Sequence, residues 1–255
     1  MTNARRVLVH ADKQALAGSL AARFITKVVD LLDAQPEVNI VLTGGTVGTA
    51  VLEAINESSA RDSIDWSRVN LWWGDERWLP AGDPERNETQ ARAALIDHVA
   101  VIESNVHPFA SSDGSLTLDG AAEEYTTELA VAGDGAEYPR FDITFLGVGP
   151  DGHVASLFPD YPGIQVTDTT VVSVRNSPKP PPERLSLTLA VLNSSDRIWL
   201  ALAGSDKASA LGLALAGAST WEVPVAGVEG RLRTVFFVDR DAAAEVPGEL
   251  IATEY

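Results

Sequence analysis

The chain has 255 residues, of which 45% are hydrophobic and 22% charged, the balance of a soluble globular protein with a sizeable core. Its formal net charge of −17 repels nucleic acids and anionic membranes, but it does not oppose a small anionic substrate where cations gather locally. Because the chain has no cysteine, disulfides, zinc–thiolate sites and a cysteine nucleophile are excluded.

Short apolar runs alternate with amphipathic stretches along the chain. The expected order is strand 5–11, helix 12–33, strand 38–45, helix 46–57, strand 68–77, helices 87–100 and 118–132, strand 141–149, a strand–turn–helix unit 197–217 and strand 234–239. This alternation predicts an α/β fold with a mostly parallel, Rossmann-like sheet and helices on both faces. We expect a single domain over residues 1–255.

Nothing in the chain indicates a membrane or a nucleic-acid partner. Uncharged apolar runs stay well short of the roughly 18 residues that a membrane span needs. The first 18 residues do not resemble a signal peptide, because His10, Asp12 and Lys13 interrupt the apolar run. We therefore expect a cytoplasmic protein, and we separately expect it to be a monomer.

Ligands of parallel sheets bind beyond the carboxyl ends of the strands. Four segments fall at such strand exits, and we expect them to meet in one crevice: Thr43–Gly45, Asp75–Arg77, Gly149–His153 and Gly204–Lys207.

The first of these segments, LTGGT, is a tight strand-to-helix turn. Gly44 and Gly45 let the backbone approach a ligand, the helix N–H groups bind anions, and Thr46 adds a hydroxyl. The stretch matches no nucleotide-binding motif. It indicates either a phosphate site or an ordinary strand–helix turn.

The second segment, WWGDERWLP, places Asp75, Glu76 and Arg77 between tryptophans that should hold it against the body. Arg77 can bind a phosphate or pair with an internal carboxylate. The sequence favours neither option.

The stretch GVGPDGHVASLFP carries the strongest indication of proton chemistry. His153 can take and return a proton near neutral pH, and Asp151 can orient the imidazole and stabilise its charged form. The alternative is that His153 caps the next helix and Asp151 fills a turn position.

Two further cations follow downstream. In SPKPPPERLSLTL, three prolines stiffen a loop that presents Arg184 at the start of a strand. In LAGSDKASAL, Lys207 lies in the first turn of a helix, an unfavourable place for a cation unless it meets an anion. A solvated surface lysine is the alternative there.

Metal and serine-hydrolase chemistry find no support in the motifs. His10, His98 and His107 are scattered without metal-ligand spacing, and Ser156 does not lie in a nucleophile elbow. We expect no metal and no cofactor.

Six stretches together resemble the 6-phosphogluconolactonases, hydrolases of the pentose phosphate pathway. They are TGGT, GDERWLP, SNVHPF, GVGPDGHVASLFP, SPKPPPERLSLTL and AGSDKA. The resemblance implies a one-domain fold shared with glucosamine-6-phosphate isomerase/deaminases. It implies hydrolysis of a sugar-phosphate lactone, with His153 as base and then acid, Asp151 as its orienting partner and Asp75 positioning sugar hydroxyls or water. The substrate phosphate would then meet Gly44, Gly45, Thr46 and the cations Arg77, Arg184 and Lys207.

The isomerase/deaminases are the main rival, because they share the D-G-H turn. Their pattern resembles D-G-H-x-A-F-N-E, with a glutamate five residues after the histidine, where this chain has Phe158. An apolar ring cannot exchange protons, so the sequence favours lactone hydrolysis. A sugar-phosphate sensor without activity is the third alternative.

Overall fold

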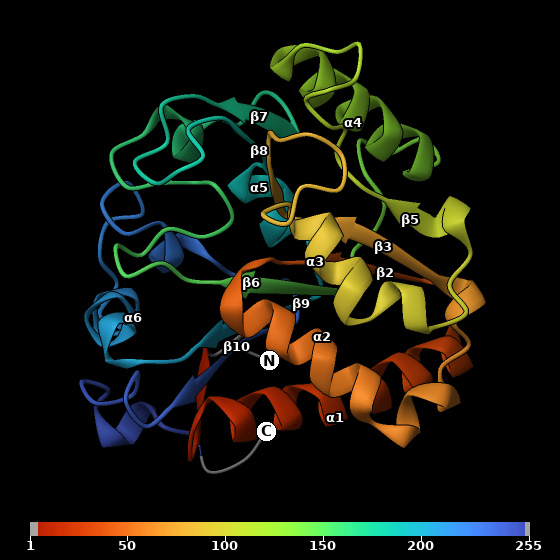
Figure 1. Cartoon of the computed structure of the whole chain (residues 1–255). Coiled ribbons are helices and arrows are strands. Elements are labelled where there is room, and N and C mark those ends of the chain that lie inside the picture. Colours follow the sequence, from red (N-terminus) through yellow and green to blue (C-terminus); the bar gives the residue numbers. More distant parts are fainter. Residues whose placement is uncertain (1–4, 253–255) are drawn as a thin grey trace.

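A seven-stranded parallel sheet forms the centre of the computed structural model (Figure 1), which describes residues 5–252. The ends of the predicted domain, residues 1–4 and 253–255, lie outside the described residues. In spatial order the strands are β1 (Arg6–His10), β10 (Arg233–Asp239), β9 (Arg197–Leu202), β6 (Ile143–Gly147), β2 (Val38–Leu42), β3 (Val69–Trp73) and β5 (Val106–His107).

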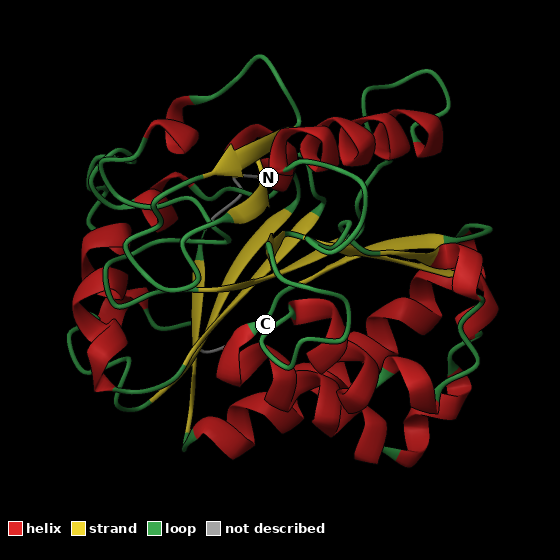
Figure 2. Cartoon of the chain, turned by 45° about the horizontal axis from the view of Figure 1, so that its top comes forward, coloured by secondary structure: helices red, strands yellow, loops and turns green. Residues whose placement is uncertain are grey.

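Helices cover both faces of this sheet, as predicted. Figure 1 shows α1 and α2 below the sheet and α4 above it, and Figure 2 shows the same layers from another side. The α-helices are α1 (Lys13–Ala34), α2 (Gly45–Glu57), α3 (Asn87–Ala94), α4 (Leu118–Ala132), α5 (Leu189–Asn193) and α6 (Ala208–Leu215).

A second sheet, which the sequence analysis did not anticipate, lies on the α4 side. Its three antiparallel strands are β4 (Asp75–Arg77), β8 (Arg184–Leu187) and β7 (Val171–Val174), in that spatial order. The β4–β8 register places Arg77 opposite Arg184 and Asp75 opposite Ser186. Two arginines 107 positions apart in sequence therefore become cross-strand neighbours.

The expected strand 68–77 is consequently two strands. Gly74 separates them: its N–H donates to Leu42 O of β2 (3.0 Å), whereas its carbonyl accepts from Leu187 N (2.8 Å). The chain thus passes from one sheet to the other at this residue. The expected helix 87–100 is also shorter, because Leu95 leaves helical dihedral angles (φ −146°, ψ −51°) and a short 3₁₀ turn, Ile96–His98, follows.

One continuous hydrophobic core joins the layers. The inner face of α1 carries apolar residues at spacings of four, with Leu16, Leu20, Phe24 and Val28 all buried. Asp12 begins this helix by accepting from Ala15 N (2.8 Å). Such packing fixes the strand ends that carry the polar residues.

The chain changes direction across the sheet between β2 and β6. From β2 it continues to β3 and β5 on one side, and then returns to β6, β9 and β10 on the other. Ligands of open parallel sheets bind outside the carboxyl ends at such a switch point.

Candidate active site

A cavity of about 620 Å³ lies at this switch point. Its wall includes eight of the nine residues predicted for the site: Gly44, Gly45, Thr46, Asp75, Arg77, His153, Arg184 and Lys207. The ninth, Asp151, does not line the cavity but contacts His153. The prediction that the four strand exits converge is confirmed by this arrangement.

The turn between β2 and α2 forms one wall. Gly45 has a left-handed φ of +81°, and residues 45–48, the first turn of α2, all line the cavity. The N-cap residue, Gly44, has no side chain to satisfy the first N–H groups of the helix. A Cβ at Gly44 would lie 1.8 Å from Asn87 Oδ1, so only glycine fits there. This helix end is suited to an anion.

The turn after β6 forms the facing wall and is closed by hydrogen bonds from Gly149 N to His153 O and from Gly152 N to Gly149 O, both 2.9 Å. Within it, His153 Nδ1 lies 2.6 Å from Asp151 Oδ1. A Cβ on Gly149 would lie 2.0 Å from His153 Nδ1, so the imidazole occupies the space that this glycine leaves open. The predicted His–Asp pair is therefore a direct contact.

Apolar and cationic neighbours complete the surroundings of His153. The buried Phe158 ring packs against its imidazole, with ring centroids 4.7 Å apart. Lys179 Nζ lies 3.1 Å from Asp151 Oδ1. Although burial acts to raise it, the hydrogen bond from His153 and the ammonium of Lys179 hold the pKa of Asp151 well below its usual range. Asp151 is therefore a carboxylate at neutral pH.

Asp75 presents a fixed, buried carboxylate to the cavity. Its Oδ2 accepts from Ser156 Oγ (2.7 Å), and Asn87 Nδ2 donates to its backbone oxygen (2.8 Å) and more weakly to Oδ1 (3.3 Å). Asn87 also packs against Gly44, so one amide side chain joins the carboxylate to the anion-binding turn.

The paired arginines of β4 and β8 are held by backbone carbonyl groups. Arg77 Nη1 donates to Glu85 O. Arg184 Nη2 donates to Pro180 O (2.9 Å), and its Nε donates to Pro181 O (3.2 Å). Burial lowers the pKa of the Arg184 guanidinium from its very high usual value. No carboxylate lies within 4 Å of either guanidinium in the part of the chain that the structure describes, so both charges remain available to a ligand.

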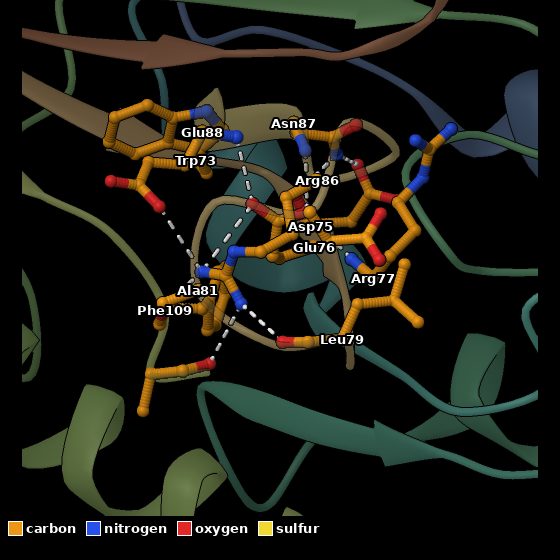
Figure 3. A network of polar contacts seen from close by, with 12 residues as sticks. Trp73, Asp75, Glu76, Arg77, Leu79, Ala81, Arg86, Asn87, Glu88 and Phe109 are labelled. Atoms are coloured by element: carbon orange, nitrogen blue, oxygen red, sulfur yellow. Dashed lines mark hydrogen bonds and ion pairs between the residues drawn. The ribbon is translucent and has the colours of Figure 1, made fainter. Parts of the chain in front are cut away.

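Glu76, the middle residue of β4, points away from the cavity into a buried network (Figure 3). Its carboxylate accepts from the backbone N–H groups of Asn87 (2.7 Å) and Glu88 (2.9 Å) and pairs with Arg86 (3.8 Å). Burial raises the pKa of Glu76 to about 7, against the opposing effect of Arg86 and the backbone donors. This network fixes β4 to the start of α3, and its role is structural.

The position of Lys207 differs from the sequence prediction. It lies in a 3₁₀ turn, Ser205–Lys207, directly before α6 rather than in the first turn of that helix. Its Nζ pairs with Asp206 (3.1 Å) while its side chain lines the cavity.

Two cavity cations were missed by the sequence analysis. Lys179 stands inside the proline-rich motif from which only Arg184 was selected, and Lys13 follows the exit of β1. The strand-exit rule, applied to the first strand as well, indicates Lys13.

Residues 5–252 contain neither a cluster of metal ligands nor a membrane-spanning helix. No three His, Asp or Glu side chains gather there as metal ligands. No helix in this range has the length and apolar character needed to cross a membrane.

A helix end suited to an anion, beside a His–Asp pair at the switch point of a parallel sheet, is typical of α/β proteins that act on small phosphorylated compounds. The chain belongs to the family described as glucosamine-6-phosphate isomerases/6-phosphogluconolactonase, whose model matches residues 11–236. It is 49% identical to the 6-phosphogluconolactonase of Streptomyces coelicolor, over 98% of each chain. It is 43% identical to that of Mycobacterium tuberculosis, over 94% of this chain and 97% of the relative.

Solved structures agree with these relatives. The 6-phosphogluconolactonase from Thermotoga maritima superposes with a TM-score of 0.81 at 28% identity, covering 92% of this chain and all of the other. A monomeric glucosamine-6-phosphate deaminase reaches a TM-score of 0.77 at 20% identity, which shows the shared fold alone. The predicted resemblance to 6-phosphogluconolactonases is confirmed.

Proposed function

We propose that this chain hydrolyses 6-phospho-D-glucono-1,5-lactone to 6-phosphogluconate, the second step of the oxidative pentose phosphate pathway. One observation carries the proposal: His153, in contact with Asp151, lines the same cavity as the first turn of α2 and the arginines of β4 and β8. A proton-transfer group and an anion site therefore lie within the reach of one small molecule. The 42–49% identity to proteins named 6-phosphogluconolactonase supports the choice of substrate.

His153 is the proton-transfer residue of this proposal. Asp151 lies 2.6 Å from Nδ1 and accepts its hydrogen, so Nε2 is left as the basic nitrogen. Nε2 removes a proton from water as the water oxygen bonds to C1 of the lactone. The same proton then passes to the ring oxygen as the C1–O bond breaks. Asp151 stabilises the imidazolium between the two steps.

The anion site binds the phosphate of the substrate. The N–H groups of Gly45 and Thr46 and the cations Arg77, Arg184 and Lys207 line one continuous surface. Charge-assisted hydrogen bonds contribute on the order of 1.5–3 kcal/mol each. Two or three of them hold an anionic sugar in a protein whose net charge of −17 repels it from a distance.

Asp75 is the proposed acceptor for sugar hydroxyls or for the attacking water. Ser156 and Asn87 fix its carboxylate in place, so it meets the substrate without rearranging. We propose that the protein works as a monomer in the cytoplasm.

The test is hydrolysis of 6-phosphoglucono-δ-lactone made freshly in situ, measured as 6-phosphogluconate formed above the spontaneous rate. The protein should give a clear excess, and His153→Ala should lower kcat by roughly 10²–10⁴ while remaining folded. Near-normal turnover by the folded variant would remove His153 from the mechanism. If the folded wild-type protein gives no hydrolysis above the spontaneous rate, the proposed function is overturned. Deamination of glucosamine 6-phosphate and binding of 6-phosphogluconate would then be tested.

A further inference from the structure

Lys179 shares the carboxylate that orients His153. Both Lys179 Nζ (3.1 Å) and His153 Nδ1 (2.6 Å) approach the same oxygen, Oδ1 of Asp151. Lys179 comes from the proline-rich loop, 28 residues away in sequence, and its side chain lines the cavity. The negative charge of Asp151 therefore interacts with two partners, His153 and Lys179, rather than with His153 alone.

The loop holds this lysine in place although its side chain is 39% exposed. Ser177 Oγ donates to the Lys179 carbonyl (2.8 Å), and Arg184 Nη2 donates to the same carbonyl (3.2 Å). Ser177 N donates to Pro182 O (2.9 Å), which closes the loop at its base. The backbone of Lys179 is consequently fixed to β8, which keeps its side chain within reach of Asp151.

The ammonium group also lies 3.3 Å from His153 Nδ1. In the tautomer that the proposed mechanism assigns, Nδ1 carries the hydrogen donated to Asp151 and has no lone pair for Lys179, so the contact is one of charge rather than a hydrogen bond. A positive charge at this distance opposes a second positive charge on the imidazole.

We propose that Lys179 is a positioning residue that balances the charge of Asp151 and thereby keeps His153 neutral, ready to act as a base. With a neutral imidazole, the group formed by Lys179, Asp151 and His153 has zero net charge, whereas protonation of His153 leaves it positive. The idea rests on the proposed function for its catalytic meaning, but the coupling itself is a property of the folded protein.

Other charged side chains line the cavity around this group, but they do not take the place of Lys179 beside Asp151 and His153. They are Asp75 and Arg77 from β4, Arg184 from β8, Asp206 and Lys207 before α6, and Lys13 from α1. Among residues 5–252, the charged side chains in hydrogen-bond distance of the His153 ring are Asp151 and Lys179. Removal of Lys179 should therefore leave Asp151 unopposed beside the imidazole.

The first experiment follows the ring protons of His153 by NMR as the pH is varied, because the chain has only four histidines. The loss of one resonance in His153→Gln assigns it. In Lys179→Met the His153 pKa should rise by about one unit, and in Lys179→Arg, which keeps the charge, it should stay within roughly 0.3 units. Lys27→Met on the surface of α1 is the matched control and should leave it unchanged.

The second experiment is the pH profile of kcat/KM for lactone hydrolysis, corrected for spontaneous reaction. In Lys179→Met the acid limb of this profile should move to higher pH by the same amount as the His153 pKa. In Lys179→Arg it should lie at the wild-type position. A uniform loss of rate at every pH, with an unshifted His153 titration, would show a purely structural or substrate-binding lysine and overturn the inference. If the His153 titration shifts in Lys179→Met but the wild-type protein does not hydrolyse the lactone, the proposed function is refuted and the coupling between Lys179 and His153 still holds.

Discussion

Gly149→Ala should disable the site without changing any polar group. The added Cβ would lie 2.0 Å from His153 Nδ1 and 2.3 Å from Asp151 Oδ1. Ordinary contacts begin near 3.4 Å, so the imidazole must retreat by about 1.4 Å. Gly149 is not among the glycines with positive φ, so the substitution acts through this contact rather than through backbone strain.

The expected loss follows from the size of that displacement. Misplacement of a reacting group by about 1 Å costs on the order of 10² in rate. The arginines of β4 and β8 lie on other elements, so KM should change little while kcat falls roughly 10²-fold. Crowding should lower the free energy of unfolding by about 1–3 kcal/mol, which leaves most of the protein folded.

The assay is lactone hydrolysis with denaturant unfolding of the same samples. Gly18→Ala is the matched control: its Cβ meets nothing within 4 Å, and within α1 it should raise stability by about 0.5–1 kcal/mol at unchanged activity. Combining Gly149→Ala with His153→Ala should cost nothing beyond His153→Ala alone. Wild-type turnover in Gly149→Ala, or an additional loss in the double variant, would refute the reasoning.

Three further predictions concern the binding site, the buried network and the pH dependence of stability. Arg184→Ala should raise KM roughly 10- to 100-fold, the equivalent of one charge-assisted hydrogen bond, and an unchanged KM would place Arg184 away from the phosphate. At pH 8.5, above the Glu76 pKa of about 7, Glu76→Gln removes one of the two carboxylates beside the buried Arg86 and should lower the free energy of unfolding by about 3–5 kcal/mol in urea titrations; wild-type stability would show that Glu88 suffices as the partner of Arg86. Because the folded-state pKa of Asp151 is depressed, its stabilising effect is complete above the unfolded pKa near 4 and is lost as pH falls through the folded value. Stability curves of Asp151→Asn and wild type should therefore converge below about pH 4, whereas a constant difference from pH 3 to 7 would contradict the assignment.

The order of elements and the location of the site were predictable, because both depend on local patterns. Apolar runs of five residues followed by glycine or charge indicate buried parallel strands and their exits. Once the strands are parallel, their exits must share an edge, so Gly44, Asp75 and His153 had to lie near one another. The direct contact between Asp151 and His153 depended further on the tight turn that the glycines of this segment allow.

The second sheet was not predictable in the same way. The strand that begins at Arg184 was expected and is β8, but β4 has only three residues and shows no period, so nothing indicated that the two strands pair. The pairing of Arg77 with Arg184 is a long-range antiparallel contact that no local spacing encodes. The sharing of Asp151 by Lys179 follows from that pairing, since it is β8 that holds the proline loop against the D-G-H turn.

Phe158 is the residue on which the sequence analysis separated the two activities. Its ring is fully buried, packs against His153 and has the Arg184 guanidinium 5.6 Å from its centre. In the isomerase/deaminase pattern of the sequence analysis a glutamate stands at this position. A carboxylate there can exchange a proton with His153 and pair with the Arg184 guanidinium, which keeps its own protons. An apolar ring does the opposite: it excludes water from one face of the imidazole and leaves Asp151 and Lys179 as its polar neighbours. Hydrolysis needs one proton moved from water to a leaving oxygen, and a single histidine held by Asp151 is enough for that step.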